Sequence, residues 1–251
     1  MAKPAAARHS TLTNVLARVG ITLAALGFFC LLRPDIAGNA TRRMRSPGII
    51  ADYMKNNSVH KLQLGAGEFN LPGWLNTDIE PHPGQAFLDA TKHFPLPDSS
   101  FQIVSSEQVV EHISHEEGLF MMQESFRILK HGGKVRVATP NLLKLVDLLR
   151  DDKTPEQIAY IRGKMDWHHW GTAPDPANVI VNLEMYEFGH KFVYTPTMLR
   201  KTMEAAGFTQ VQQYESGESD DPALKGLEVR SSSNVKDIDR YETMVFEGVR
   251  P

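Results

Sequence analysis

Cysteine is almost absent from this 251-residue chain, in which Cys30 is the single example. No intrachain disulfide is possible, and the composition fits a reducing compartment. Neither sign of charge dominates, because the formal net charge is -3, which gives no reason to expect nucleic acid as a partner. Internal repeats are also missing. Because 41% of the residues are hydrophobic, we expect one substantial core, preceded by an N-terminal appendage.

The N-terminus contains a stretch without charged residues, 19–32. Its fourteen residues fall short of the roughly 20 that cross a bilayer as a helix. Extension to 11–32 reaches that length but includes Arg18, which can snorkel. We favour an uncleaved anchor. A signal or transit peptide with a small-residue site at 38–40, or a helix packed on the domain, also fits.

A basic stretch from 34 to about 57 is predicted to be an irregular linker. We therefore divide the chain into residues 1–45, an anchor or signal segment with its linker, and residues 46–251, the main domain. Charge barely decides the orientation of an anchor, because basic residues stand on both sides of the apolar stretch.

A glycine turn follows the first apolar strand pattern, where residues 59–64 lead into Gly65-Ala66-Gly67. A side chain at either glycine would block close backbone approach, so such a turn can lay its amides against the polar tail of a ligand. Asp78 ends the next apolar run and is placed to accept hydrogen bonds from the two hydroxyls of a ribose. Turn and acid together indicate a site for a nucleoside-containing cofactor.

From residue 59 onward, strand and helix patterns alternate, which is typical of a mainly parallel sheet with helices on both faces. The predicted strands are 59–64, 74–79, 101–105, 134–138, 208–214 and 241–248, and the predicted helices are about 115–130, 142–150 and 197–206. Only Gly65 to Gly73 join the first two strands, whereas a parallel crossover usually needs about a dozen residues. Either the crossover helix is a single turn or the second strand is shorter than predicted.

Six ordered segments resemble those of the class I S-adenosylmethionine-dependent methyltransferases, in particular the branch called methyltransferase type 11. They are Leu64-Gly65-Ala66-Gly67, Pro72 to Ile79, Asp89-Ala90 with Phe94 to Phe101, Glu111-His112-Ile113, Phe126 to Gly133, and Pro140-Asn141. The resemblance is dense over 60–141 and loose over 190–248. It implies an α/β fold with a doubly wound, mainly parallel seven-stranded sheet and an antiparallel C-terminal hairpin, which the last two predicted strands suit.

The same resemblance implies S-adenosyl-L-methionine as cofactor. The turn Gly65-Ala66-Gly67 would run alongside the methionine part of the cofactor, and Asp78 would hold the ribose. Asp89-Ala90 would flank the adenine, with the carboxylate accepting from the exocyclic amine. Glu107-Gln108 would lie beneath the sulfonium.

Two other functions stay open. A dinucleotide-dependent oxidoreductase shares the turn and the acid, but its fingerprint needs a third glycine where this chain has Asn70, and an acid about 20 residues on. An inactive, membrane-tethered module that binds the cofactor without turnover is the second alternative.

Methyl transfer needs a base only when the acceptor carries a proton that must leave early. The candidates are His190, His112 and Glu107, although His112 is equally explained as a structural hydrogen-bond partner. No metal is expected: Gln108 stands where an inverted zincin motif has its first histidine, and the adjacent pair His168-His169 would diverge. A loop at 171–178 is predicted to cover the substrate.

The methyl acceptor is expected to be a small molecule, a glycan or a lipid-linked compound, and its identity is not readable from the sequence. Because S-adenosylmethionine is supplied in the cytosol, we expect the domain to face the cytosol, attached to a membrane through residues 11–32. The alternative is a soluble protein after removal of a signal or transit peptide.

Overall fold

The computed structural model describes residues 34–229 and 235–251. The apolar stretch 19–32, and with it the predicted anchor or signal, lies outside these residues. Within the described ranges, no helix is both long enough and apolar enough to span a membrane.

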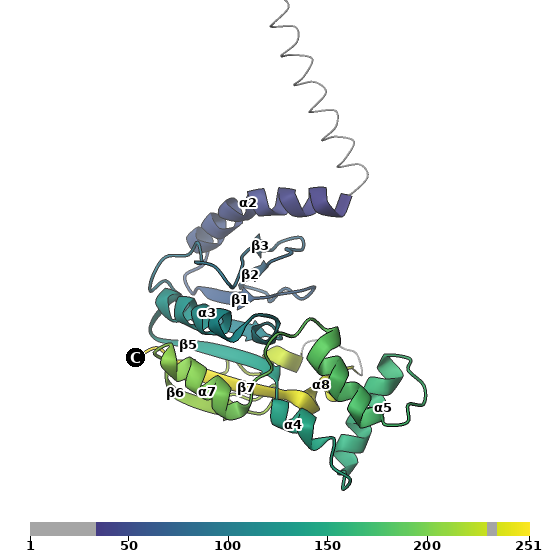
Figure 1. Ribbon diagram of the computed structural model, residues 1–251. Helices are drawn as coiled ribbons and strands as arrows, with labels where there is room; N and C mark the ends of the chain where they lie inside the picture. Colours follow the sequence, from purple (N-terminus) through teal and green to yellow (C-terminus); the bar gives the residue numbers. More distant parts are fainter. Residues whose placement is uncertain (1–33, 230–234) are drawn as a thin grey trace, which may run out of the picture.

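A seven-stranded sheet forms the centre of the domain, in the order β3-β2-β1-β4-β5-β7-β6 (Figure 1). The strands are β1 (Lys61–Leu64), β2 (Leu75–Asp78), β3 (Ala86–Phe87), β4 (Phe101–Glu107), β5 (Leu129–Pro140), β6 (Thr209–Tyr214) and β7 (Thr243–Val249). Neighbouring strands are parallel except at β7, which is antiparallel to both β5 and β6. The predicted fold class, with its antiparallel C-terminal pair, is confirmed.

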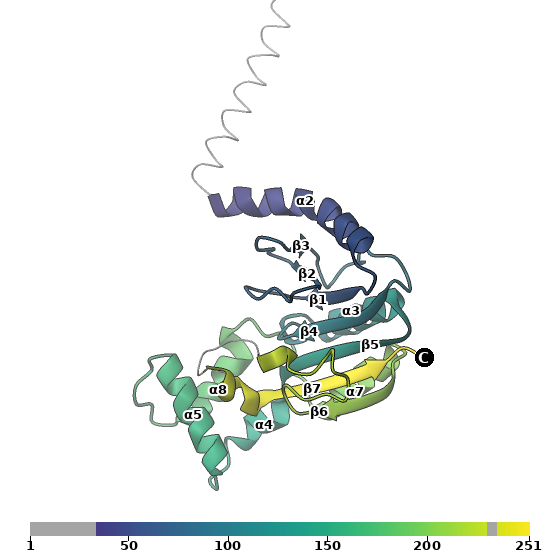
Figure 2. The same ribbon diagram turned by 180° about the vertical axis from the view of Figure 1, so that it is seen from behind.

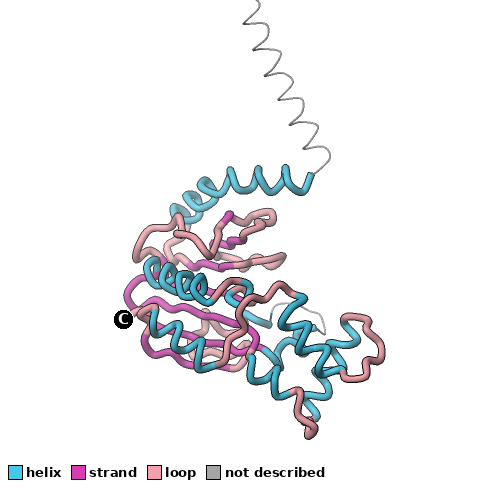
Figure 3. Tube along the Cα trace, in the orientation of Figure 1, coloured by secondary structure: helices cyan, strands magenta, loops and turns pink. Residues whose placement is uncertain are grey.

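Helices flank the sheet on one face, at the β3 edge and beyond one end. They are α2 (Pro34–Asn56), α3 (His115–Ile128), α4 (Leu142–Asp147), α5 (Pro155–Trp167), α6 (Pro176–Asn182), α7 (Pro196–Ala205) and α8 (Val235–Glu242), with single turns η1 (Val110–His112), η2 (Leu183–Glu187) and η3 (Leu227–Val229). Helices α3 and α7 cover one face, as Figures 1 and 2 show from opposite sides. Helices α4, α5, α6 and α8 form a helical extension beyond the end of β5, seen as the group of cyan helices at the lower right of Figure 3.

The predicted linker at 34–57 is wrong, because these residues form helix α2. Its apolar side chains, among them Ile50 and Met54, pack against the main core. The Tyr53 hydroxyl donates to the carbonyl of Lys61 at 3.0 Å and accepts from its amide at 2.8 Å. Ser46 Oγ accepts from the amide of Phe87 in β3 at 2.6 Å. A basic composition concealed a helix that covers the β3 edge of the sheet.

The short link between the first two strands contains turns and no helix, and β2 begins one residue later than predicted. Leu71 and Trp74 of this link pack with Ile103 of β4 and with Leu224 and Leu227. The segment that precedes η3 therefore fills the place where a crossover helix would cover the sheet.

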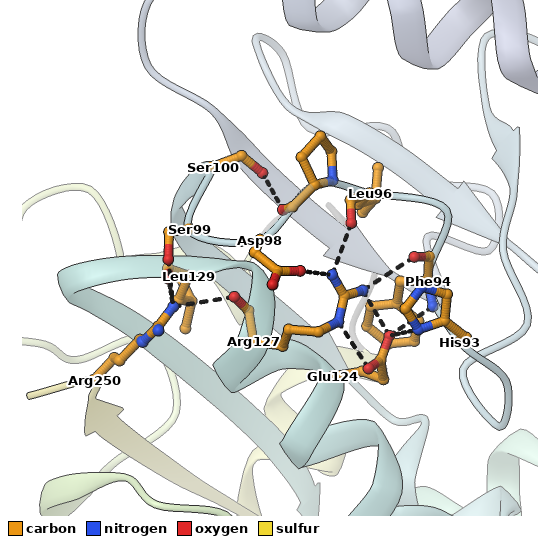
Figure 4. Close-up of polar contacts among 11 residues, drawn as sticks. His93, Phe94, Leu96, Asp98, Ser99, Ser100, Glu124, Arg127, Leu129 and Arg250 are labelled. Carbon is orange, nitrogen blue, oxygen red and sulfur yellow. Dashed lines mark hydrogen bonds and ion pairs between the residues drawn. The ribbon is translucent and has the colours of Figure 1, made fainter.

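Arg127 of α3 fastens the loop between β3 and β4 (Figure 4). Its guanidinium donates to the carbonyls of Phe94 at 3.0 Å and Leu96 at 2.9 Å. It also pairs with the carboxylates of Asp98 at 2.5 Å and Glu124 at 2.7 Å. Two of the segments that carry the family resemblance are thus joined by a structural contact.

Candidate active site

The glycine turn adopts the conformation that its residues predict. Gly65 and Gly67 have φ of +64° and +52°, values that side chains disfavour. A Cβ at Gly65 would lie 2.2 Å from Cγ2 of Val109, whereas a Cβ at Gly67 would meet nothing within 4 Å. Gly65 therefore lets the end of β4 pack on the turn, and Gly67 leaves the backbone open to a ligand.

Asp78, the last residue of β2, lies beside this turn, as predicted. Its Oδ2 accepts from the amide of Gly67 at 2.9 Å, and its Oδ1 accepts from the amide of Glu80 at 2.8 Å. Each carboxylate oxygen can accept more than one hydrogen bond, so both retain capacity for a diol. The structure gives this acid a role that the sequence did not reveal, because its carboxylate holds the turn in place.

Gln85 is a residue of the site that sequence reasoning missed. It is 1% exposed. Its Nε2 donates to the carbonyl of Gly67 at 2.7 Å and to Oδ1 of Asn70 at 2.8 Å. No motif marks it, because its partners come from a different loop. Gln85 holds the carbonyl side of the turn while Asp78 holds the amide side.

The predicted adenine flank, Asp89-Ala90, lies next to Asp78. The amide of Leu88 donates to the carbonyl of Asp78 at 3.1 Å, which places the two strand ends side by side. Oδ1 of Asp89 accepts from the amide of Thr91 at 2.9 Å and from its hydroxyl at 2.7 Å. Both bonds use Oδ1, which leaves the acceptor capacity of Oδ2 for a ligand amine.

Glu107-Gln108 end β4 at the point where the strand order reverses, the usual ligand edge of such sheets. Gln108 has φ of +52°, a strained value for this residue type. Its side chain does not reach the glycine turn, because Nε2 donates to Oγ1 of Thr243 at 3.3 Å. The side chain that contacts the turn is Val109, whose packing on Gly65 the sequence did not indicate.

The predicted bases His112 and His190 meet although they are far apart in the chain. Their ring centroids are 4.7 Å apart in an edge-on arrangement. The carbonyl of Glu111 accepts from the amides of Lys191 at 2.7 Å and Phe192 at 3.1 Å. This pair of backbone bonds docks the His190 loop, which leaves the helical extension after η2, onto η1 at the end of β4.

Burial controls the charge of the two histidines and of the neighbouring Glu111. It lowers the pKa of His112 and of His190, so both rings are neutral at neutral pH. Burial, reinforced by the charges of Glu184 and Glu107, raises the pKa of Glu111 to about 8. Nδ1 of His190 contacts the carbonyl of Glu184, which can only accept, so the free lone pair lies on Nε2.

An aromatic row leads from the helical extension to His190. The ring of Trp170 stacks on His168 at 4.9 Å, His168 contacts Phe188 at 5.7 Å, and Phe188 contacts His190 at 5.8 Å. The predicted covering loop, 171–178, runs into α6 at Pro176, and together with residues of α5 it lines an open pocket of about 460 Å³.

Comparison with known proteins gives a family match over part of the chain and similar solved structures. The family described as "Methyltransferase domain" matches residues 78–137. No curated protein matches. An S-adenosylmethionine-dependent methyltransferase from Archaeoglobus fulgidus is similar at a TM-score of 0.44 and 17% identity, over 88% of this chain and 99% of that one. Haemonchus contortus phosphoethanolamine N-methyltransferase 2, complexed with phosphomonomethylethanolamine and S-adenosylhomocysteine, is similar at 0.41 and 14%, over 77% of this chain and 49% of that one.

The family match over 78–137 and the strand order agree with the resemblance to class I S-adenosylmethionine-dependent methyltransferases: the chain has the α/β fold that this resemblance implies and carries a segment of the methyltransferase domain family. Its cofactor is S-adenosylmethionine. The residues fit this group, because the open side of Gly67 lies beside Asp78, the acid predicted to hold the ribose, and the neighbouring Asp89.

Proposed function

We propose that the protein transfers a methyl group to a hydroxyl of a small-molecule, glycan or lipid-linked acceptor. The observation that carries this proposal is the pair of neutral histidines, His112 and His190, next to the end of β4. When bound, S-adenosylmethionine supplies a sulfonium methyl group that reacts by in-line displacement. An amine acceptor that is already neutral needs no base, whereas a hydroxyl does. A pair of neutral bases that the fold holds in place therefore favours an acceptor that is methylated on an oxygen atom.

His190 is the better placed proton acceptor of the pair. The carbonyl of Glu184 holds its Nδ1–H, so Nε2 keeps its lone pair and the ring keeps one orientation. Backbone groups of Phe188 and Gly189 contact His112, which positions it beside His190. Glu107 remains a third candidate base at the end of β4.

The surroundings of His190 support an acceptor with an apolar or ring-shaped face. Four exposed aromatic side chains stand on the same extension: Trp167 (54% exposed), Trp170 (40%), Tyr186 (77%) and Phe188 (40%). Such rings bind apolar chains and the faces of sugars at low entropic cost. We place the acceptor between this aromatic surface and the glycine turn.

The test combines binding with transfer. Calorimetry should show that the purified protein binds S-adenosylmethionine, and neither NAD nor NADP. Isotope-labelled methyl should pass to a component of a lipid and metabolite extract. His190→Ala should lower that transfer by about 10²- to 10⁴-fold at unchanged cofactor affinity.

The matched control is His169→Asn, at an exposed histidine with φ of +55° that asparagine tolerates. Transfer by this variant should equal that of the parent. Cofactor binding without transfer to any acceptor would instead support the inactive binding module. Tighter binding of NAD would overturn the methyltransferase proposal.

We also propose that the domain acts in the cytosol, attached to a membrane through residues 11–32. The support is the cytosolic supply of the cofactor and the absence of cysteine from 46–251. An apolar acceptor such as a lipid would be within reach of a tethered domain.

A further inference from the structure

Three side chains of the histidine cluster converge like metal ligands. Among the described residues, Glu111, His112 and His190 each offer one ligand atom, and these atoms lie within 4.8 Å of one another. Glu111 is 0% exposed. Its Oε1 is buried without a hydrogen-bond partner. A buried carboxyl oxygen without a partner, beside two imidazoles, calls for a further ligand.

The groups around the cluster hold its members as outer-sphere residues hold metal ligands. Nδ1 of His190 contacts the carbonyl of Glu184, which directs Nε2 into the cluster. Oε2 of Glu111 accepts from Oγ1 of Thr139 at 2.9 Å, which leaves Oε1 for a cation. Metal-binding histidines and carboxylates usually have such a second hydrogen bond.

We propose that Glu111, His112 and His190 bind a divalent first-row transition metal ion, such as Zn²⁺. Two imidazoles and one carboxylate suit this class of ion, whereas Mg²⁺ and Ca²⁺ prefer oxygen ligands. Three protein ligands leave at least one coordination position open. The sequence concealed this site, because Gln108 breaks the local motif and the third ligand comes from a distant loop.

Closure of the site needs only a small movement. Ligands of one ion at bond lengths of about 2.1 Å lie roughly 3–3.4 Å apart, so atoms at the 4.8 Å limit must approach one another by about 1.4–1.8 Å. His190 stands directly after Gly189, which has φ of +74°, on an exposed loop end. Rotation of the His112 ring and a shift of this loop bring the ligands together.

The site deepens the proposed function and rests on it. Val109, two residues before Glu111, packs on Gly65, so the ion would lie beside the cofactor turn. A hydroxyl of the acceptor that enters the open position loses its proton to water, because the ion stabilises its oxyanion. The oxygen would then use its electron pair to form the O–C bond while the C–S bond breaks, and the electron pair of the C–S bond would stay on the sulfur, which becomes a neutral thioether. The ion takes over the part that the histidine lone pairs play without it.

The probe is Co²⁺, which reports its own ligands through visible absorption bands. Chelator-treated full-length protein should bind one equivalent of Co²⁺, and Zn²⁺ should displace it while Mg²⁺ should not. Glu111→Gln and His190→Ala should each weaken binding by about 100-fold or more. Thr139→Val, which removes only the outer hydrogen bond, should weaken it by about 10- to 100-fold.

The control is again His169→Asn. His169 adjoins His168, and this histidine pair is the first candidate for metal binding that the sequence suggests. The variant should bind Co²⁺ like the parent. Cofactor affinity, measured on the same preparations, shows that each variant is folded and tests the proposed function separately. Absence of stoichiometric Co²⁺ binding overturns the proposal. So does Co²⁺ binding that the Glu111 and His190 variants leave unchanged.

Discussion

Replacement of Arg127 by alanine should destabilise the domain by about 2–4 kcal/mol. The side chain is 22% exposed, and it pairs with Glu124, whose side chain is 9% exposed. The change removes the donors of two carbonyls, those of Phe94 and Leu96, and leaves Glu124 with only the amide of Phe94 and the exposed His93 ring as partners (Figure 4). Breaking a fully buried pair costs about 3–5 kcal/mol, and the partial exposure of Arg127 lowers that figure.

Urea unfolding followed by circular dichroism measures this loss. Arg127→Lys should fall between the parent and the alanine variant, because lysine keeps the charge but not the planar fork. Arg150→Ala is the control, since Arg150 is 61% exposed and pairs only with surface acids; it should leave the unfolding midpoint unchanged. An alanine variant within about 0.5 kcal/mol of the parent would refute the reasoning, since water would then replace the guanidinium.

The same contact predicts a pH dependence. Burial raises the pKa of Glu124, but hydrogen bonds from Arg127 and from the amide of Phe94 outweigh it, so the pKa is lowered. A lowered pKa stabilises the folded state, and this stabilisation is fully present at pH values above the pKa of the unfolded state, about 4.3. It is lost as the pH falls through the pKa of the folded state. The gap in stability between the parent and Arg127→Ala should therefore narrow below about pH 4.3.

Four further predictions concern the cofactor turn and the N-terminus. Asp78→Ala should cost about 1.5–3 kcal/mol of S-adenosylmethionine affinity by calorimetry, and unchanged affinity would mean that another group, with Glu80 the next candidate, holds the ribose. Gly65→Ala should lower the melting temperature more than Gly67→Ala, because only the first Cβ meets Val109; equal shifts would contradict the packing. Deletion of 1–33 should leave a folded, cofactor-binding protein, whereas deletion of 1–56 should destabilise it by removing α2. Protease added at the cytosolic face of sealed membranes should reach the domain, and protection there would show that it has been translocated.

Local patterns in the sequence were sufficient to predict the glycine turn and the ends of several helices and strands. The positive φ that Gly65 and Gly67 adopt is a property of those residues alone. Helix α3 begins at the predicted His115, where Ser114 and Glu117 form a capping box, and it ends two residues before the predicted Lys130. A two-residue strand such as β3 has no period to detect, and it exists because β2 offers it an edge.

The sequence by itself determined the fold class, the cofactor turn and the acid beside it, because these depend on residues close together in the chain. Only the tertiary structure decided that His190 meets His112, that Gln85 holds the turn and that α2 covers the sheet edge. These contacts depend on how distant segments pack, and packing of a loop on a strand end leaves no local periodicity. The cluster of Glu111 with two histidines is therefore a product of the assembled fold, although each of its residues was visible in the chain.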